Sequence, residues 1–186
     1  MKQFSGFESK RSGNGRESLP AGGYVCQIQG ARVEDFSWGS RLVLAIDVCE
    51  GEYAGIWKRD YDNNTNEDKK WRGTFRLSIP VDDGSEKDAW TKRAFNNMIW
   101  SVEQSNPGFT WDWDEKKLKN KKIGIIYRNR EWEFNGNTGW TTEAGGSDSI
   151  DNIREGKFKP LKDRPLKTRP VQTAADTAED ESELPF

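Results

Sequence analysis

The stretch Tyr24-Val25-Cys26-Gln27-Ile28-Gln29-Gly30-Ala31-Arg32-Val33 contains two phases of alternation that meet at a glycine. Before Gly30, the side chains of Tyr24, Cys26 and Ile28 share one face of an extended chain, and after it the apolar positions move to the other phase. A glycine at such a shift is typical of a β-bulge, which bends a strand. We therefore expect a bent first strand, as small β-barrels need to close.

More extended segments surround this strand. Apolar residues alternate along Arg41–Glu50, and the four residues Phe36–Gly39 before it form a hairpin-sized link. Such a hairpin would place Cys26 and Cys49 opposite each other as reduced core residues. Later extended segments are expected at Gly55–Asp62, Trp71–Val81, Ile123–Tyr127, Arg128–Phe134, Trp140–Glu143 and Ile150–Phe158.

Ser85–Gln104 is predicted to be the one helix. Ser85 is a good N-cap residue with an acid three positions later, and apolar residues recur at helical spacing. We assign its aromatic residues Trp90, Phe95 and Trp100 to the core. Three strands, a helix and further strands are the order of an OB-fold. The sequence therefore predicts a mainly β protein, an OB-fold-like five-stranded β-barrel with one helix.

Three regions are expected along the 186 residues. Residues 1–18 are polar and contain glycine, and we interpret them as a flexible N-terminal arm. Residues 19–158 have the size of one domain and would form the barrel. Residues 159–186 begin as a proline-rich basic segment and end acidic, which is typical of a disordered linker and an interaction tail.

Two features bear on the compartment. The longest apolar run, Leu42–Ile46, is far shorter than a membrane span, and Met1–Arg11 lacks the apolar segment of a secretion signal. The chain has two cysteines, which indicates a reducing environment. We expect a cytoplasmic protein without a membrane partner.

Catalytic patterns are scarce in this sequence. It has no histidine, no phosphate-binding loop and no zinc-type cysteine set, so no catalytic residue, metal or cofactor is expected. Carboxylates remain as an alternative. Asp60 and Asp62 would share one strand face, and their two carboxylates could hold Mg²⁺ against a phosphate in a nuclease that also uses a lysine such as Lys58. Most such acid pairs are simply solvated.

Aromatic residues are unusually frequent for so polar a chain, with nine Trp, nine Phe and four Tyr. Single-stranded nucleic acids are held by rings that stack on bases and by cations that contact phosphates. Both types alternate in three groups, although Trp57 and Phe75 could equally belong to the core. The candidate nucleic-acid-binding residues are Trp57, Lys58, Arg59, Tyr61, Lys69, Lys70, Trp71, Arg72, Phe75, Arg76, Arg128, Arg130, Trp132 and Phe134.

The tail Val171–Phe186 carries five of the 31 acidic residues and none of the 29 basic ones, so the rest of the chain has a formal charge of +3. It closes on Leu184-Pro185-Phe186, and an acidic stretch ending on a large apolar ring resembles the tail of bacterial single-stranded DNA-binding proteins. In that family the terminal Phe enters a pocket on replication and repair partners. The resemblance implies partner-binding roles for Asp180, Glu181, Glu183, Leu184, Pro185 and Phe186.

A second resemblance covers most of residues 19–160. The segments Leu19–Tyr24, Asp47–Gly55 and Ile150–Lys157 are similar to segments of small phage proteins from low-GC Gram-positive hosts, several of which are encoded among replication and recombination genes. This implies a phage-encoded single-stranded DNA-binding protein that acts in the cytoplasm of the host cell.

These observations favour a protein that binds single-stranded DNA with little sequence preference and recruits replication or recombination proteins through its acidic tip. Two alternatives stay open. One is a metal-dependent nuclease or junction-processing enzyme, and the other is a recombination adaptor without DNA affinity. Edge strands of such a barrel could also pair into a homodimer, although no residue pattern requires it.

Overall fold

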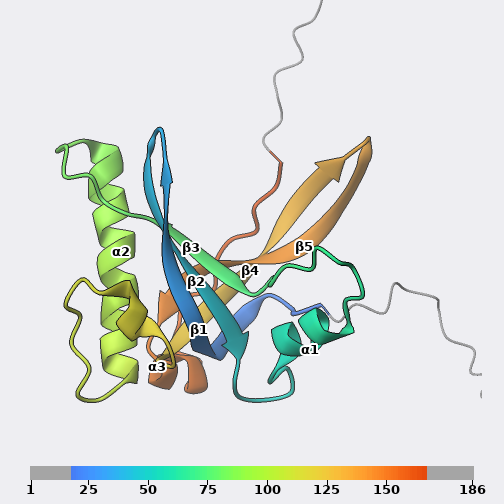
Figure 1. Cartoon of the computed structure of the whole chain (residues 1–186), viewed down its shortest axis with the longest axis horizontal. Helices are drawn as coiled ribbons and strands as arrows, with labels where there is room; N and C mark the ends of the chain where they lie inside the picture. Colours follow the sequence, from blue (N-terminus) through green and yellow to red (C-terminus); the bar gives the residue numbers. More distant parts are fainter. Residues whose placement is uncertain (1–17, 167–186) are drawn as a thin grey trace, which may run out of the picture.

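The computed structural model describes residues 18–166, in which five strands form one antiparallel sheet of order β3-β2-β1-β4-β5 (Figure 1). The mainly β prediction is confirmed. The prediction of a single helix is wrong, because this part of the chain holds three α-helices. The elements are β1 (Gly22–Phe36), β2 (Gly39–Val48), α1 (Ile56–Asn63), β3 (Thr74–Ser78), α2 (Glu86–Ser105), the 3₁₀ helix η1 (Glu115–Leu118), β4 (Lys122–Phe134), β5 (Asn137–Asp148) and α3 (Ile150–Arg154).

β1 is shared by the two halves of the sheet. It pairs with β4 from Gly22 to Gln27 and with β2 from Cys26 to Phe36. The register with β2 shifts between Ile28 and Gly30. The predicted bulge is therefore confirmed, and it lets β1 bend from one neighbour toward the other.

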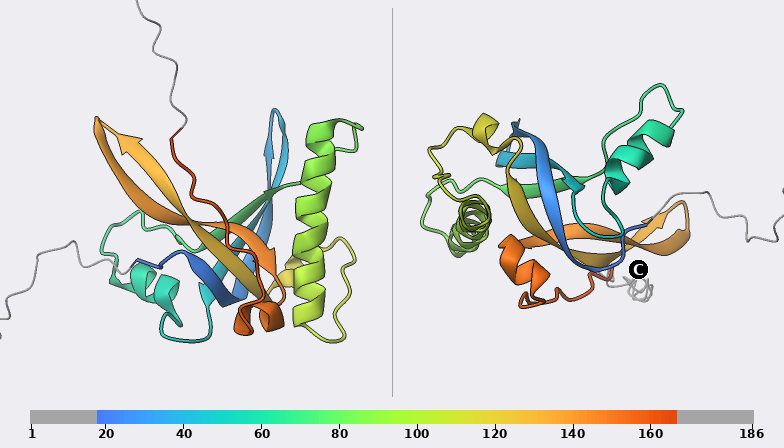
Figure 2. Two further views of the ribbon diagram at one scale, coloured as in Figure 1. Left: turned by 180° about the vertical axis from the view of Figure 1, so that it is seen from behind. Right: turned by 90° about the horizontal axis from the view of Figure 1, so that it is seen from below.

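β3 and β5 are the two edge strands of this sheet. They approach each other in space, yet no hydrogen-bonded ladder joins them within residues 18–166. The hairpins β1–β2 and β4–β5 diverge from the sheet toward the same side of the molecule (Figures 1 and 2). The predicted barrel is thus not closed by backbone pairing in the described part of the chain, and its seam lies between β3 and β5.

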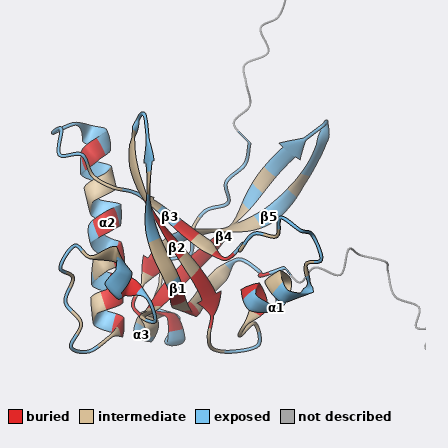
Figure 3. Ribbon diagram, in the orientation of Figure 1, coloured by how far each residue is buried: buried red, intermediate tan, exposed pale blue. Residues whose placement is uncertain are grey.

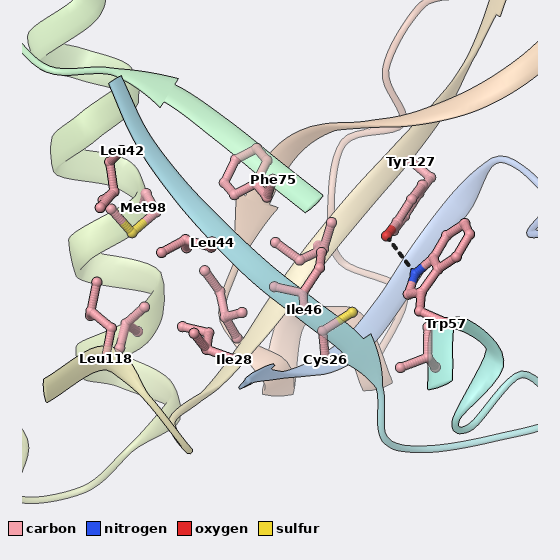
Figure 4. Close-up of a cluster of buried hydrophobic side chains, with 14 of the residues drawn as sticks. Cys26, Ile28, Leu42, Leu44, Ile46, Trp57, Phe75, Met98, Leu118 and Tyr127 are labelled. Atoms are coloured by element: carbon pink, nitrogen blue, oxygen red, sulfur yellow. Dashed lines mark hydrogen bonds between the residues drawn. The ribbon is translucent and has the colours of Figure 1, made fainter. Parts of the chain in front are cut away.

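The core lies between the sheet and α2, and the hairpin tips are exposed (Figures 3 and 4). α2 buries Phe95, Met98 and Val102, whereas Trp90 and Trp100 are 62% and 44% exposed. The assignment of these two Trp residues to the core is therefore wrong. The reason is geometric, because α2 contacts the sheet through one narrow stripe and both Trp residues lie outside it. No helix in residues 18–166 has the length and apolar character that crossing a bilayer requires.

The segment predicted as a strand at Gly55–Asp62 is a helix, α1. The buried Asp47 carboxylate on β2 accepts the backbone N–H groups of Trp57 at 3.0 Å and Lys58 at 3.3 Å, so a distant side chain satisfies the first turn of α1. Burial raises the pKa of the Asp47 carboxyl, and these two N–H groups oppose the rise. This contact across the sequence overrides the local alternation that suggested a strand.

The chain after β5 also differs from the expectation. Ile150–Phe158, predicted to be extended, begins with α3, which is capped by the Ser149 hydroxyl accepting the Asn152 N–H at 3.2 Å. Residues 159–166, assigned to a linker, are held against β4. Arg164 N–H donates to the Asn129 carbonyl at 2.8 Å, and Glu131 N–H donates to the Arg164 carbonyl at 2.9 Å. We call residues 159–166 the strap.

The two cysteines do not face each other. Cys26 pairs with Val48 across β1 and β2, one position away from Cys49, and both thiols are free. The predicted hairpin is confirmed, since Phe36 pairs with Gly39. Most of the predicted arm (1–18) and the acidic tip with its candidate partner-binding residues lie outside the described residues.

Gly73 provides a test of the packing. A Cβ at this position would overlap the Ile46 carbonyl and the Trp57 ring, whereas a Cβ at Gly30 would have open space. We expect Gly73→Ala to lower the free energy of unfolding by about 1–3 kcal/mol, as overpacking does. The control Gly30→Ala should change it by less than about 0.5 kcal/mol. Urea unfolding monitored by Trp fluorescence measures both, and equal stability of the two variants would contradict this packing.

Candidate nucleic-acid interface

The seam between β3 and β5 forms a groove of about 490 Å³. Residues from β2, β3, β4, β5 and the strap line it, together with Trp57 and Arg72. Among residues 18–166, Glu143 is the one acidic residue in this lining. We call it the arginine groove, after the six arginines that line it: Arg41, Arg72, Arg76, Arg128, Arg130 and Arg164.

Three arginines come from the β2–β3 side of the groove. The Arg41 guanidinium lies 5.0 Å and 5.2 Å from the ring centroids of Phe36 and Trp38. Arg72 donates to the Asp60 carboxylate at 3.1 Å. The Arg76 side chain forms no hydrogen bond or ion pair with any described residue. On this wall the positive charge of the arginines is therefore only partly balanced by carboxylates.

The other three arginines surround one carboxylate. Arg128 on β4 contacts Glu143 on β5 at 2.9 Å, and Arg164 on the strap reaches the same oxygen at 3.3 Å. Arg130 lies 3.7 Å from the second oxygen. Backbone hydrogen bonds of the strap hold Arg164 in this place, so a residue remote in sequence completes the second wall.

Exposed aromatic rings lie at the tips of both hairpins. On β1–β2, the rings of Phe36 and Trp38 stack with centroids 4.9 Å apart and planes 7° from parallel. On β4–β5, Phe134 and Trp140 are 69% and 54% exposed, and Trp132 packs over Gly139 on the neighbouring strand. Figure 1 shows the two hairpins extending toward the same side of the molecule, and residues of both, Arg41 and Arg130, line the arginine groove.

The structure separates the predicted residues into three sets. Arg72, Arg76, Arg128 and Arg130 converge in the groove, with Trp132 and Phe134 on the adjoining hairpin. Trp57 and Phe75 also line the groove but are buried, so they form its floor and belong to the core. The residues that do not line the groove are Lys58, Arg59, Tyr61, Lys69, Lys70 and Trp71.

This last set lies on α1 and the loop after it. Lys58 pairs with Asp62 at 2.7 Å, and Lys69 lies 4.5 Å from the centre of the Tyr61 ring. The Trp71 indole N–H donates to two backbone carbonyls, at 2.9 Å and 3.1 Å. The bond from Trp71 to the Ile46 carbonyl ties the loop to β2, and the other two contacts lie within α1 and its loop.

The sequence prediction missed two arginines of the groove, Arg41 and Arg164, and the rings of Phe36 and Trp38 next to Arg41. Phe36, Trp38 and Arg41 surround the predicted hairpin turn, and their own alternation of rings and a cation was a usable signal. Arg164 had no such signal, because it reaches the groove only through the pairing of the strap with β4.

The carboxylate pair considered for a metal site does not converge as expected. Asp60 and Asp62 lie on α1 rather than on one strand face, and they pair with Arg72 and Lys58, respectively. Among residues 18–166, no three His, Cys, Asp or Glu side chains gather closely enough to hold a metal ion.

Comparison with known proteins does not identify a family for this chain. No family model matches the sequence, and no curated protein is significantly similar to it.

The floor of the groove offers a stability test. The buried Tyr127 hydroxyl accepts the Trp57 indole N–H at 3.3 Å, and burial raises the pKa of the Tyr127 phenol (Figure 4). Tyr127→Phe leaves this buried N–H without its partner and should cost about 1–3 kcal/mol of unfolding free energy. The half-buried Tyr61 serves as the control, since Tyr61→Phe should cost less than about 0.5 kcal/mol. Chemical unfolding of both variants measures the difference, and equal losses would contradict the assigned hydrogen bond.

Proposed function

We propose that this protein binds single-stranded DNA in the arginine groove, with little sequence preference. The observation that carries the proposal is the arginine groove itself, in which six arginines and one acid lie between two hairpins with exposed aromatic tips. Guanidinium groups contact phosphates, and exposed rings stack on unpaired bases. This combination favours a flexible single strand over a duplex, whose bases are already stacked.

The distribution of charge supports the proposal more than the total does. A formal charge of +3 outside the acidic tail is modest for a DNA-binding protein. The cations are concentrated, however, and Arg41 and Arg76 form no ion pair with a described carboxylate. A strand lying in the groove would bring its phosphates to these groups and release counterions.

The position of the hairpins agrees with the same proposal. OB-folds bind oligonucleotides on the face of strands 2 and 3 and through the loops that join strands 1 to 2 and 4 to 5. In this chain the corresponding turns are the tips of β1–β2 and β4–β5, which carry Trp38 and Phe134. Stacking is tolerant of base identity, so low sequence preference is expected.

The acidic tip is proposed to recruit a replication or recombination protein, with Leu184, Pro185 and Phe186 as its main contacts. We further propose a phage origin and the cytoplasm of the host cell as the site of action. These proposals rest on the resemblances described from the sequence. An adaptor without DNA affinity is the alternative that the binding experiments below would reveal.

The first binding test concerns charge. Removing the Arg76 cation should weaken binding to oligo-dT. The plot of log binding constant against log salt concentration should also become shallower by about 0.7, the value for one phosphate contact on a single strand. The comparison uses Arg76→Gln and the control Lys116→Gln on η1, outside the groove. Fluorescence anisotropy across a salt series measures both slopes. Equal losses of affinity in the two variants would indicate a nonspecific charge effect and contradict binding in the groove.

The second binding test concerns stacking. Trp38→Ala and Phe134→Ala should each weaken oligo-dT binding by about 1–3 kcal/mol, the cost of one lost base–aromatic stack. Trp100 in the C-terminal half of α2 is 44% exposed and does not line the groove, so Trp100→Ala is the matched control and should bind as the wild type does. Titrations with a duplex of equal length complete the design. Unchanged affinity in both hairpin variants would exclude the tips from the interface.

A further inference from the structure

Glu143 occupies an unusual position for an acid. In the described part of the chain it is the one acidic residue lining the arginine groove, and three guanidinium groups lie within 3.7 Å of its carboxylate. These arginines come from two segments, β4 and the strap, that a single small anion would bridge. A carboxylate surrounded in this way takes the place that a phosphate oxygen would take, because guanidinium groups recognise both.

The two walls of the groove differ in how far their arginines are already paired with carboxylates. Arg41 and Arg76 form no ion pair with a described carboxylate, and Arg72 is paired with an acid outside the lining. On the other wall, Arg128 and Glu143 side chains are 28% and 22% exposed, so their pairing is partly shielded from water. Shielded pairs are stronger than exposed ones. One wall is therefore open to phosphates, and the other already holds an anion.

We propose that Glu143 is a resident phosphate mimic that controls entry of phosphates into the cluster of Arg128, Arg130 and Arg164. It keeps these arginines in place in the free protein and competes with an incoming phosphate. A lone phosphate or a mononucleotide gains too little to displace it. A strand that contacts Arg41 and Arg76 at the same time supplies several phosphates at high effective concentration and displaces it. Glu143 thus selects polymeric single strands over free nucleotides, an inference that rests on the proposed function.

The test is Glu143→Gln, which keeps the shape of the side chain and removes its charge. The control is Glu155→Gln, which makes the same change at an exposed residue directly after α3, outside the groove and away from both hairpin tips. We expect Glu143→Gln to bind oligo-dT about five- to twentyfold more tightly, with a salt slope steeper by about 0.7, and Glu155→Gln to resemble the wild type. Thymidine 5′-phosphate at millimolar concentration should compete with oligo-dT for Glu143→Gln but not for the wild-type protein.

The outcomes separate the two proposals. Absence of oligo-dT binding by both the wild type and Glu143→Gln would overturn the proposed function and this inference with it. Binding by the wild type with unchanged or weaker binding by Glu143→Gln would overturn the inference alone, since Glu143 would then only support the arginines. An equal gain in Glu155→Gln would also overturn it, because the effect would follow net charge and not the groove. A purely structural role would lower the melting temperature of Glu143→Gln without steepening the salt slope.

Discussion

The pairing of one bent strand with two neighbours is the constraint on which the rest of this structure depends. Cys26 and Gln27 of β1 take part in both ladders, and the bulge beyond Ile28 redirects the strand along β2. A straight strand could not hold β4 at one end and follow β2 at the other. The bend sends the β1–β2 and β4–β5 hairpins apart and brings the unpaired edges of β3 and β5 toward each other.

The arginine groove is a consequence of that open seam. Edge strands leave backbone groups unpaired, and natural proteins protect such edges with charged side chains. Here the charges are arginines from both walls, and the strap adds Arg164 from a segment beyond the sheet. Glu143 relieves the repulsion on one wall, whereas Arg76 on the other has no partner among the described residues. The same surface that prevents edge pairing is therefore suited to a polyanion.

The sequence predicted the features that local patterns determine. The bulge near Gly30, the turn at Phe36–Gly39 and the helix capped by Ser85 follow from glycine placement, turn length and capping chemistry. It failed where a distant contact decides the local conformation. The Asp47 carboxylate on β2 accepts a backbone N–H group at the start of α1, and no pattern within residues 55–62 predicts this contact. Four of the groove arginines were predicted as binding residues because aromatic residues are their neighbours in the sequence. The position of the strap and the burial of Trp57 depend on tertiary packing and could not be predicted in this way.

The most direct test of the central claim is to map where a single strand lies on the full chain. Ultraviolet cross-linking of oligo-dT, followed by mass spectrometry of the linked peptides, makes this measurement. We predict cross-links at the two hairpin tips, in residues 36–41 and 132–140, that excess unlabelled single strand removes and duplex does not. Cross-links confined to α1 and its loop, residues 56–71, or to the outer face of α2 would contradict it, as would no cross-linking at all.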